Sequence, residues 1–329
     1  MHLNPTPTAP ESGTTAPRSC RDRFHLDACE GASPGSLRLL NFAASSYHAE
    51  LERQSCSLLK PLLASPARYK AQFFETRRCS DAMAFGSLLH TLVLEPHLFH
   101  TQYVVVPGSG KLSAAESRAF AATHPGKTVL LDVEFQEMRL LADRVLHRLF
   151  KGRPVARYLE EGIAEATFFY EDPVTGVPCR VRLDMWHPDF IFDLKTTRHG
   201  EVLQFVRNAV DLHYDLQAYM YCLADALWEG RAVARPFVFL AANSQAPHPV
   251  HVLTAGSTFL ANGRAKYERA LSLYKACAEL DFWPDGSADE DIELEPWQQF
   301  RPGAVGCAPS DDPDASSVAV PCCEEGVAP

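Results

Sequence analysis

Two aspartates and a lysine are the residues of this chain best suited to chemistry. Asp184 is followed, after eight residues, by Asp193, Leu194 and Lys195. Converging carboxylates repel each other unless a cation lies between them, and carboxylate oxygens suit Mg²⁺ or Mn²⁺. A lysine on the same face can hold a water molecule or stabilise a developing phosphorane charge. The pattern outlines metal-dependent phosphodiester cleavage, although the tripeptide alone is more typical of a solvated strand with a weak salt bridge.

Alternating apolar and polar residues place these groups on neighbouring strands. An antiparallel meander is predicted over residues 164–171, 177–186 and 190–196, and a further pair of strands over about 236–242 and 249–254. One face of the second run is expected to hold Val177, Cys179, Val181, Leu183 and Met185. The short turn at 187–189 makes the second and third runs neighbours, which brings Asp184 beside Asp193 across the ladder.

Amphipathic helices supply further polar groups. Helices are predicted over 82–94, 133–151 and 214–228. Gln217 and Tyr221 share a face of the last helix, and Gly86 shares a face with His90 in the first, because residues four apart are neighbours. A glycine weakens a helix interior, so we expect another backbone to approach Gly86 closely. His90 by itself is more typical of a buried, hydrogen-bonded histidine than of a ligand.

Together these segments resemble the PD-(D/E)xK nucleases. The motifs that carry the resemblance are GSLLH at 86–90, Glu165, D-x8-DLKTT from 184, and QAYMY at 217–221. Their order and spacing are similar to the phage exodeoxyribonuclease VIII (RecE-like) type, which is related to lambda exonuclease and the RecB nuclease domain. The resemblance extends from about Asn41 to Trp283. It implies a restriction-endonuclease-like α/β core, with a central mixed sheet, an antiparallel meander that carries the site, and helices on both faces.

The resemblance also implies roles for individual residues. The implied metal ligands are His90, Asp184, Asp193 and the carbonyl group of Leu194. The implied catalytic residues are Lys195, Asp184, Asp193, Glu165, Gln217 and Tyr221. Lys195 would position and activate the attacking water, with a lowered pKa or as a base. Glu165 would approach the metal or the lysine, and the two helix residues would orient the lysine, the water or the scissile strand.

The implied enzyme is a Mg²⁺-dependent DNA exonuclease, with Mn²⁺ as an alternative ion, that hydrolyses a phosphodiester by in-line attack of a metal-activated hydroxide. It would act 5′ to 3′ on the ends of linear duplex DNA and leave 3′ single strands for phage-type recombination. Its implied partners are a single-strand annealing protein and further copies of the chain, in a ring of three or four. Two alternatives stay open: a flap or single-strand endonuclease of the same superfamily, and a non-catalytic DNA-binding module. The intact Asp184, Asp193 and Lys195 set argues against the second.

Candidate DNA contacts lie in two regions. The candidates are Ser55, Ser57, Lys60, Arg68, Arg180 and Arg182. The first four flank a helix start expected at Ser65 and Pro66, in the region with which related exonucleases grip a 5′ end. Ordinary surface charge explains these four about equally well. Arg180 and Arg182 share the expected face of Asp184 and could meet a backbone phosphate or merely balance local acids.

Composition fits a soluble protein, cytoplasmic in a bacterium or encoded by a phage. The 329 residues are 46% hydrophobic, enough for a packed core, and no run of about eighteen apolar residues predicts a membrane span. Residues 285–329 hold eleven of the 41 acidic residues and one of the 31 basic residues, which leaves 30 acidic and 30 basic residues in the body of the chain, residues 1–284. A neutral body can still carry a basic groove for phosphates. We expect a flexible tail over 1–36, a nuclease domain over 37–285 and an acidic flexible tail over 286–329.

Overall fold

The computed structural model describes residues 26–27, 33, 35–75, 80–108 and 113–287. The helices and strands discussed below belong to one compact unit within residues 1–286. The two predicted tails, 1–36 and 286–329, lie almost wholly outside the described residues. No helix in the described part of the chain is long and apolar enough to cross a membrane.

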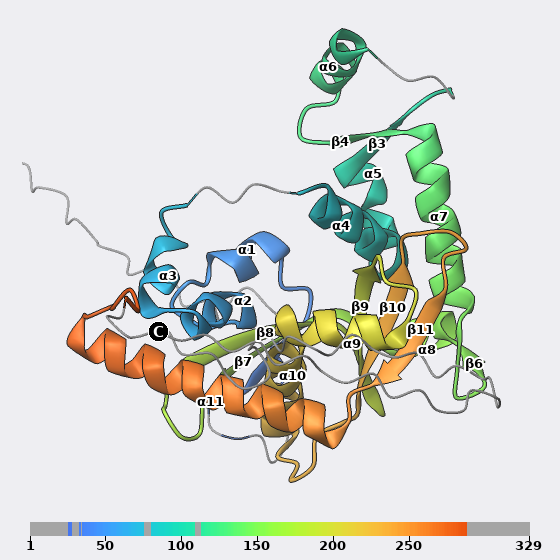
Figure 1. Cartoon of the computed structure of the whole chain (residues 1–329). Coiled ribbons are helices and arrows are strands. Elements are labelled where there is room, and N and C mark those ends of the chain that lie inside the picture. Colours follow the sequence, from blue (N-terminus) through green and yellow to red (C-terminus); the bar gives the residue numbers. More distant parts are fainter. Residues whose placement is uncertain (1–25, 28–32, 34, 76–79, 109–112, 288–329) are drawn as a thin grey trace, which may run out of the picture. The chain divides into compact units, whose positions relative to one another are not determined.

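A seven-stranded mixed sheet forms the centre of this unit, and Figure 1 labels its strands β7 to β11. The order of the strands is β1-β2-β7-β8-β9-β10-β11. Its strands are β1 (Leu26–Asp27), β2 (Leu37–Leu39), β7 (Ile163–Glu171), β8 (Pro178–His187), β9 (Phe190–Thr197), β10 (Phe237–Asn243) and β11 (Val250–Thr254). Neighbouring strands are antiparallel except β9 and β10, which are parallel. The predicted meander and the later strand pair are therefore confirmed to within one residue at each end.

Turn residues fix both corners of the meander. At the first corner, Asp172 Oδ1 accepts a hydrogen bond from the backbone amide of Thr175 at 2.7 Å. Gly176 follows with a φ of +72°, a conformation that glycine adopts without steric strain. At the second corner, the amide of Asp189 donates to Nδ1 of His187 at 3.1 Å. These local bonds explain why the strand register could be predicted from the turn composition.

Helices cover both faces of the sheet, and successive residues of β10 alternate between two core clusters. The first cluster is formed with α2 (Cys56–Leu59), α9 (Val202–Asp211), α10 (Tyr214–Glu229) and α11 (Ser257–Leu280). The second is formed with α4 (Asp81–Leu94), α7 (Asp132–His147) and α8 (Val155–Glu161). The predicted α/β fold, a central mixed sheet flanked by helices, is confirmed.

Shorter elements connect this framework. The helical ones are α1 (Ala44–Ala49), η2 (Lys60–Leu63), α3 (Pro66–Ala71), η3 (Pro96–Leu98), α5 (Phe99–Gln102) and α6 (Ala114–Thr123). Two small sheets pair β3 (Tyr103–Val106) with β4 (Thr128–Leu131) and β5 (Leu149–Phe150) with β6 (Arg153–Pro154). The helix predicted over 133–151 therefore ends early, at His147, because the following residues form the β5–β6 hairpin.

Two helical glycines differ in their surroundings. A Cβ added at Gly86 would meet only Oγ1 of Thr196, at 3.6 Å, so the expected close approach of another backbone at Gly86 is wrong. Such an approach occurs instead at Gly263 of α11, where an added Cβ would overlap the carbonyl group of Asp215 in α10. The crossing of α10 and α11 therefore depends on the missing side chain of Gly263.

Candidate metal centre and active site

The strands β8 and β9 separate where the predicted catalytic residues lie. Their backbone pairing extends only as far as Met185 opposite Phe192. Asp184 comes next along β8, and its Oδ2 accepts a hydrogen bond from the backbone amide of Leu194 at 2.7 Å. The carboxylate of Asp184 thus takes the place of a backbone partner for Leu194, and the hydrogen-bonded ladder ends at the predicted catalytic residues.

The pairing of β7 with β8 is interrupted at the same level. The residues on either side of Glu165 pair with β8, but Glu165 itself has a φ of +52°, which is uncommon for a residue with a side chain. Leu183 packs in the α10 cluster and Met185 in the α4 cluster, so the prediction that Met185 shares the face of Leu183 is wrong. The alternation of faces slips because Asp184 is left out of the ladder on both sides.

The side chains of His90, Glu165 and Asp184 converge at this irregularity. Each offers one ligand atom, and the three atoms lie within 4.8 Å of one another. Nε2 of His90 lies 3.7 Å from Oδ2 of Asp184 and 2.8 Å from the carbonyl oxygen of Leu194. Oxygen-rich donor sets of this kind suit Mg²⁺ or Mn²⁺. The residues therefore form a candidate metal centre, in which three of the four predicted ligand residues lie together.

Asp193, the fourth predicted ligand, lies outside this cluster and is held by two other groups. Its side chain is fully buried. Oδ1 accepts a hydrogen bond from Nε2 of Gln217 at 2.8 Å, and Oδ2 lies 2.5 Å from Nζ of Lys195. Gln217 therefore orients the carboxylate and, through it, the lysine. Tyr221 lies one turn further along α10 and is buried in the first core cluster, which α10 forms with α2, α9 and α11.

Burial governs the charges of the site. Burial raises the pKa of Glu165 to about 8, with Asp184 adding to the rise and Arg182 opposing it. Burial likewise raises the pKa of Asp193 to about 6, although Lys195 opposes the change. Burial lowers the pKa of Lys195, but the attraction of Asp193 and Asp184 is stronger, and the net pKa lies above its ordinary value. The predicted lowered pKa of Lys195 is wrong for the protein alone. Carboxyl groups whose ionisation is opposed by burial would release their protons to a bound divalent cation, as metal ligands do.

Arg182 holds Glu165 in place. Its Nε lies 3.0 Å from Oε2 of Glu165 and donates to the main-chain oxygen of the same residue at 3.3 Å. A second nitrogen of Arg182 donates to the carbonyl group of Phe42. Arg180 is only 3% exposed, and its guanidinium carbon lies 4.6 Å from the ring centre of Tyr47. Both predicted DNA-binding arginines of β8 are thus engaged by the protein itself.

Tyr214 is a site residue that sequence reasoning missed. Nζ of Lys195 lies 5.0 Å from the centre of its ring, and Nζ of Lys60 lies 5.4 Å from the same centre. Both distances allow a cation–π interaction. Tyr214 precedes Gln217 by three residues, so the helical spacing that joined Gln217 to Tyr221 could also have identified it.

The remaining candidate DNA contacts lie before and within α3. The hydroxyl of Ser55 accepts a hydrogen bond from the amide of Leu58 at 3.3 Å and caps α2. Ser57 and Arg68 are exposed at the surface. Ser65 caps α3 and Pro66 begins it, so the predicted helix start is confirmed, while the DNA contacts themselves stay predictions.

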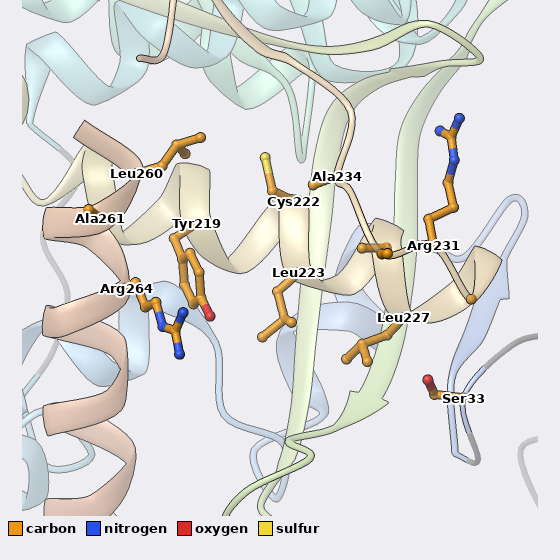
Figure 2. Close-up of a pocket in the computed structure, with 13 residues that line it drawn as sticks. Ser33, Tyr219, Cys222, Leu223, Leu227, Arg231, Ala234, Leu260, Ala261 and Arg264 are labelled. Atoms are coloured by element: carbon orange, nitrogen blue, oxygen red, sulfur yellow. The ribbon is translucent and has the colours of Figure 1, made fainter. Parts of the chain in front are cut away.

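A larger groove lies between α10 and α11, away from the face that carries Gln217. It has a volume of about 750 Å³ (Figure 2). Figure 2 shows Leu223 and Leu227 of α10 along it, with Leu260 and Arg264 of α11 at one end. Its described lining contains no carboxylate and no imidazole. The chemistry therefore belongs to the gap between β8 and β9 and not to this groove.

The chain matches a family of known proteins. The model of the family described as "PDDEXK-like domain of unknown function (DUF3799)" matches residues 55–294, a span that includes every residue of the candidate metal centre. No curated protein matches the chain. A crystal structure of a "putative exonuclease" from Eubacterium rectale matches with a TM-score of 0.49 and 16% identity, over 77% of this chain and 97% of that one. At that TM-score the likeness carries no argument about function.

Proposed function

Because the chain belongs to the PDDEXK-like family whose model spans residues 55–294, we propose that it is a metal-dependent deoxyribonuclease. The observation that carries the proposal is the cluster of His90, Glu165 and Asp184 within 4.8 Å, beside a buried ion pair of Asp193 with Lys195. Metal ligands next to a fixed positive charge are groups that metal-dependent hydrolysis of a phosphodiester uses.

The residues of the site divide the work between metal binding and charge placement. The three clustered side chains would hold a divalent ion, which when bound supplies a Lewis acid and a water of lowered pKa. Lys195 would orient the attacking water and balance the negative charge that develops on the phosphorane. Asp193 holds the lysine in that position, and Gln217 fixes Asp193 from α10. The placement of the lysine is therefore set before substrate binds, as electrostatic catalysis needs.

The finer substrate assignment follows from the resemblance to RecE-like exonucleases. We propose that the enzyme digests linear duplex DNA from its ends, 5′ to 3′, and leaves 3′ single strands for recombination. Its partners would be a single-strand annealing protein and two or three further copies of this chain in a ring. A cytoplasmic location accords with this role.

Digestion of end-labelled linear duplex beside a covalently closed circle, with Mg²⁺, tests the proposal. The wild type should degrade the linear DNA only, and Lys195→Ala should slow this by about 100- to 1000-fold. Lys275→Ala, which removes an exposed lysine of α11, is the matched control and should retain activity. Cutting of the circle would indicate an endonuclease, and binding without cleavage would indicate a non-catalytic module.

A further inference from the structure

A second groove lies at the β11 edge of the sheet, where the C-terminal half of α7 meets the turn between β10 and β11. It has a volume of about 560 Å³. The ionisable side chains of its lining are Arg144, His147, Arg148, His248 and His251. Each of them is an arginine or a histidine, so we refer to it as the basic groove.

We propose that the basic groove binds the sugar–phosphate backbone of the DNA strand on one side of the scissile bond. This inference rests on the proposed function and adds the position of the substrate beyond the active site. Residues 1–284 carry equal numbers of acids and bases. Affinity for a polyanion must therefore come from a local concentration of positive charge, and this groove supplies one.

The two arginines of the groove are available to a ligand. Arg144 and Arg148 are exposed, and neither guanidinium has a hydrogen bond or ion pair with any residue that the structure describes. Several other exposed arginines are neutralised by glutamates, namely Arg153 by Glu161, Arg157 by Glu160 and Arg264 by Glu268. Arg144 lies in the last turn of α7 and Arg148 is the next residue after that helix, and both line the groove, so the pair can bind adjacent phosphates through their planar guanidinium groups.

The basic groove is in register with the active site. His251 on β11 pairs with Ala241 on β10, which pairs with Lys195 on β9. Two strand spacings place the backbone of His251 roughly 10 Å from that of Lys195. Nε2 of His251 also lies 2.8 Å from the carbonyl oxygen of Gly200, just beyond β9. One strand of DNA carries a phosphate about every 3.4 Å along the axis, so a DNA strand bound at Lys195 would reach the groove within a few nucleotides.

A separate polar groove of about 570 Å³ lies at the end of β9, next to the β10–β11 turn. It is lined by Thr196 and Arg198, one and three residues after Lys195, and by Asp81 and Phe85 of α4. Its other lining residues include Glu137 of α7 and Ser244 of the β10–β11 turn. Because α7 and this turn also form the basic groove, a strand that leaves the active site past Arg198 is guided between them.

Binding of a fluorescein-labelled duplex, measured by anisotropy in EDTA, separates this inference from cleavage. Arg144→Gln/Arg148→Gln should raise Kd roughly ten- to sixty-fold at about 100 mM salt. It should also reduce the slope of log K against log salt by nearly two, because each duplex phosphate contact contributes about 0.9. Arg264→Gln/Arg269→Gln removes the same charge from α11, which packs on the other face, and should change Kd less than about twofold.

The outcomes distinguish the groove from the proposed function. If the wild type binds and cleaves DNA while the Arg144/Arg148 variant has an unchanged Kd and salt slope, the groove assignment is overturned and the nuclease proposal stands. If the wild type neither binds nor cleaves DNA, the nuclease proposal fails first. A lower melting temperature with unchanged binding would also overturn the groove, since the arginines would then serve only the negative end of the α7 dipole.

Discussion

Replacement of Glu165 by glutamine should make the stability of the protein less sensitive to pH. Burial, and then Asp184, raises the pKa of Glu165 from an ordinary value of 4.5 to about 8. Between these two values the folded protein keeps a proton that the unfolded chain has released. Rising pH therefore favours the unfolded state, and the stability that the neutral carboxyl group allows is lost as the pH passes through 8.

The size of this effect follows from the change in pKa. A rise in pKa from 4.5 to about 8 corresponds to roughly 5 kcal/mol. The side chain of Glu165 is partly exposed to solvent, which screens the effect, so we expect about 2–4 kcal/mol from Glu165. Glutamine has the shape of the protonated carboxyl group. The two proteins should therefore differ little in stability at pH 5 and should diverge between pH 5 and about 8, because there the unfolded wild-type chain ionises while the folded protein keeps its proton.

Urea unfolding in EDTA at pH 5, 7 and 9 measures the divergence. Glu171→Gln is the matched control, because Glu171 is the exposed last residue of the same strand, and its stability should follow the wild type within about 0.5 kcal/mol. Adding Mg²⁺ at pH 9 should stabilise the wild type, by about 2.7 kcal/mol at one hundred times Kd. The Glu165→Gln protein should gain less, because it has lost a ligand.

Two results would refute this reasoning. If Glu165→Gln follows the pH dependence of the wild type, Glu165 is not held neutral by burial. If Mg²⁺ stabilises both proteins equally, Glu165 does not belong to the metal centre.

Further predictions concern the helices that position the site. Gly86→Ala should stabilise the protein by about 0.5–1 kcal/mol, whereas Gly263→Ala should destabilise it by more than about 2 kcal/mol through overlap with α10. If urea unfolding finds the Gly263→Ala protein more stable than the Gly86→Ala protein, the described packing is contradicted. Asp225 is fully buried and accepts hydrogen bonds from Trp186 at 2.7 Å and from Arg235 at 2.6 Å. Replacement of Asp225 by alanine should lower the free energy of unfolding by about 3–5 kcal/mol, and a decrease below about 1 kcal/mol would show that these hydrogen bonds matter little. Tyr214→Phe should keep the ring beside Lys195 and the wild-type kcat, whereas Tyr214→Leu should lower kcat about tenfold with KM unchanged; equal activity of the two variants would exclude a positioning role.

The strands and helices could be predicted because their signals are local. Alternation and turn residues defined β7, β8 and β9, and Asp172 and Gly176 made the first corner recognisable. The end of α7 could not be predicted in this way, since β5 and β6 interrupt it through a pairing that leaves little trace in periodicity. The close crossing at Gly263 depends on the docking of α11 against α10, which no local pattern reports.

The sequence predicted which residues form the candidate site better than it predicted the contacts between them. The contact of His90 with Leu194 joins residues 104 positions apart, and only the resemblance to known nucleases suggested it. The helical spacing of Gln217 was visible in the sequence, but its partner, Asp193, was not. Arg182 was predicted to contact DNA or to balance a local acid, and the acid that it binds is Glu165. Alternation could not identify that partner, because it gives the face of a strand residue and not the neighbour that it meets there.

The slip at Asp184 explains how side chains from opposite faces reach one site. In a regular ladder, residues 184 and 193 would face the same side of the sheet, and one layer of helices would meet both carboxylates. Because Asp184 leaves the ladder, its carboxylate lies beside His90 of α4, whereas Asp193 binds Gln217 of α10. The positive φ of Glu165 costs about 1–3 kcal/mol, and the unpaired strand positions add to that cost. Stability alone would not favour such a distortion, so its coincidence with the buried carboxylates supports a role in holding the metal ligands.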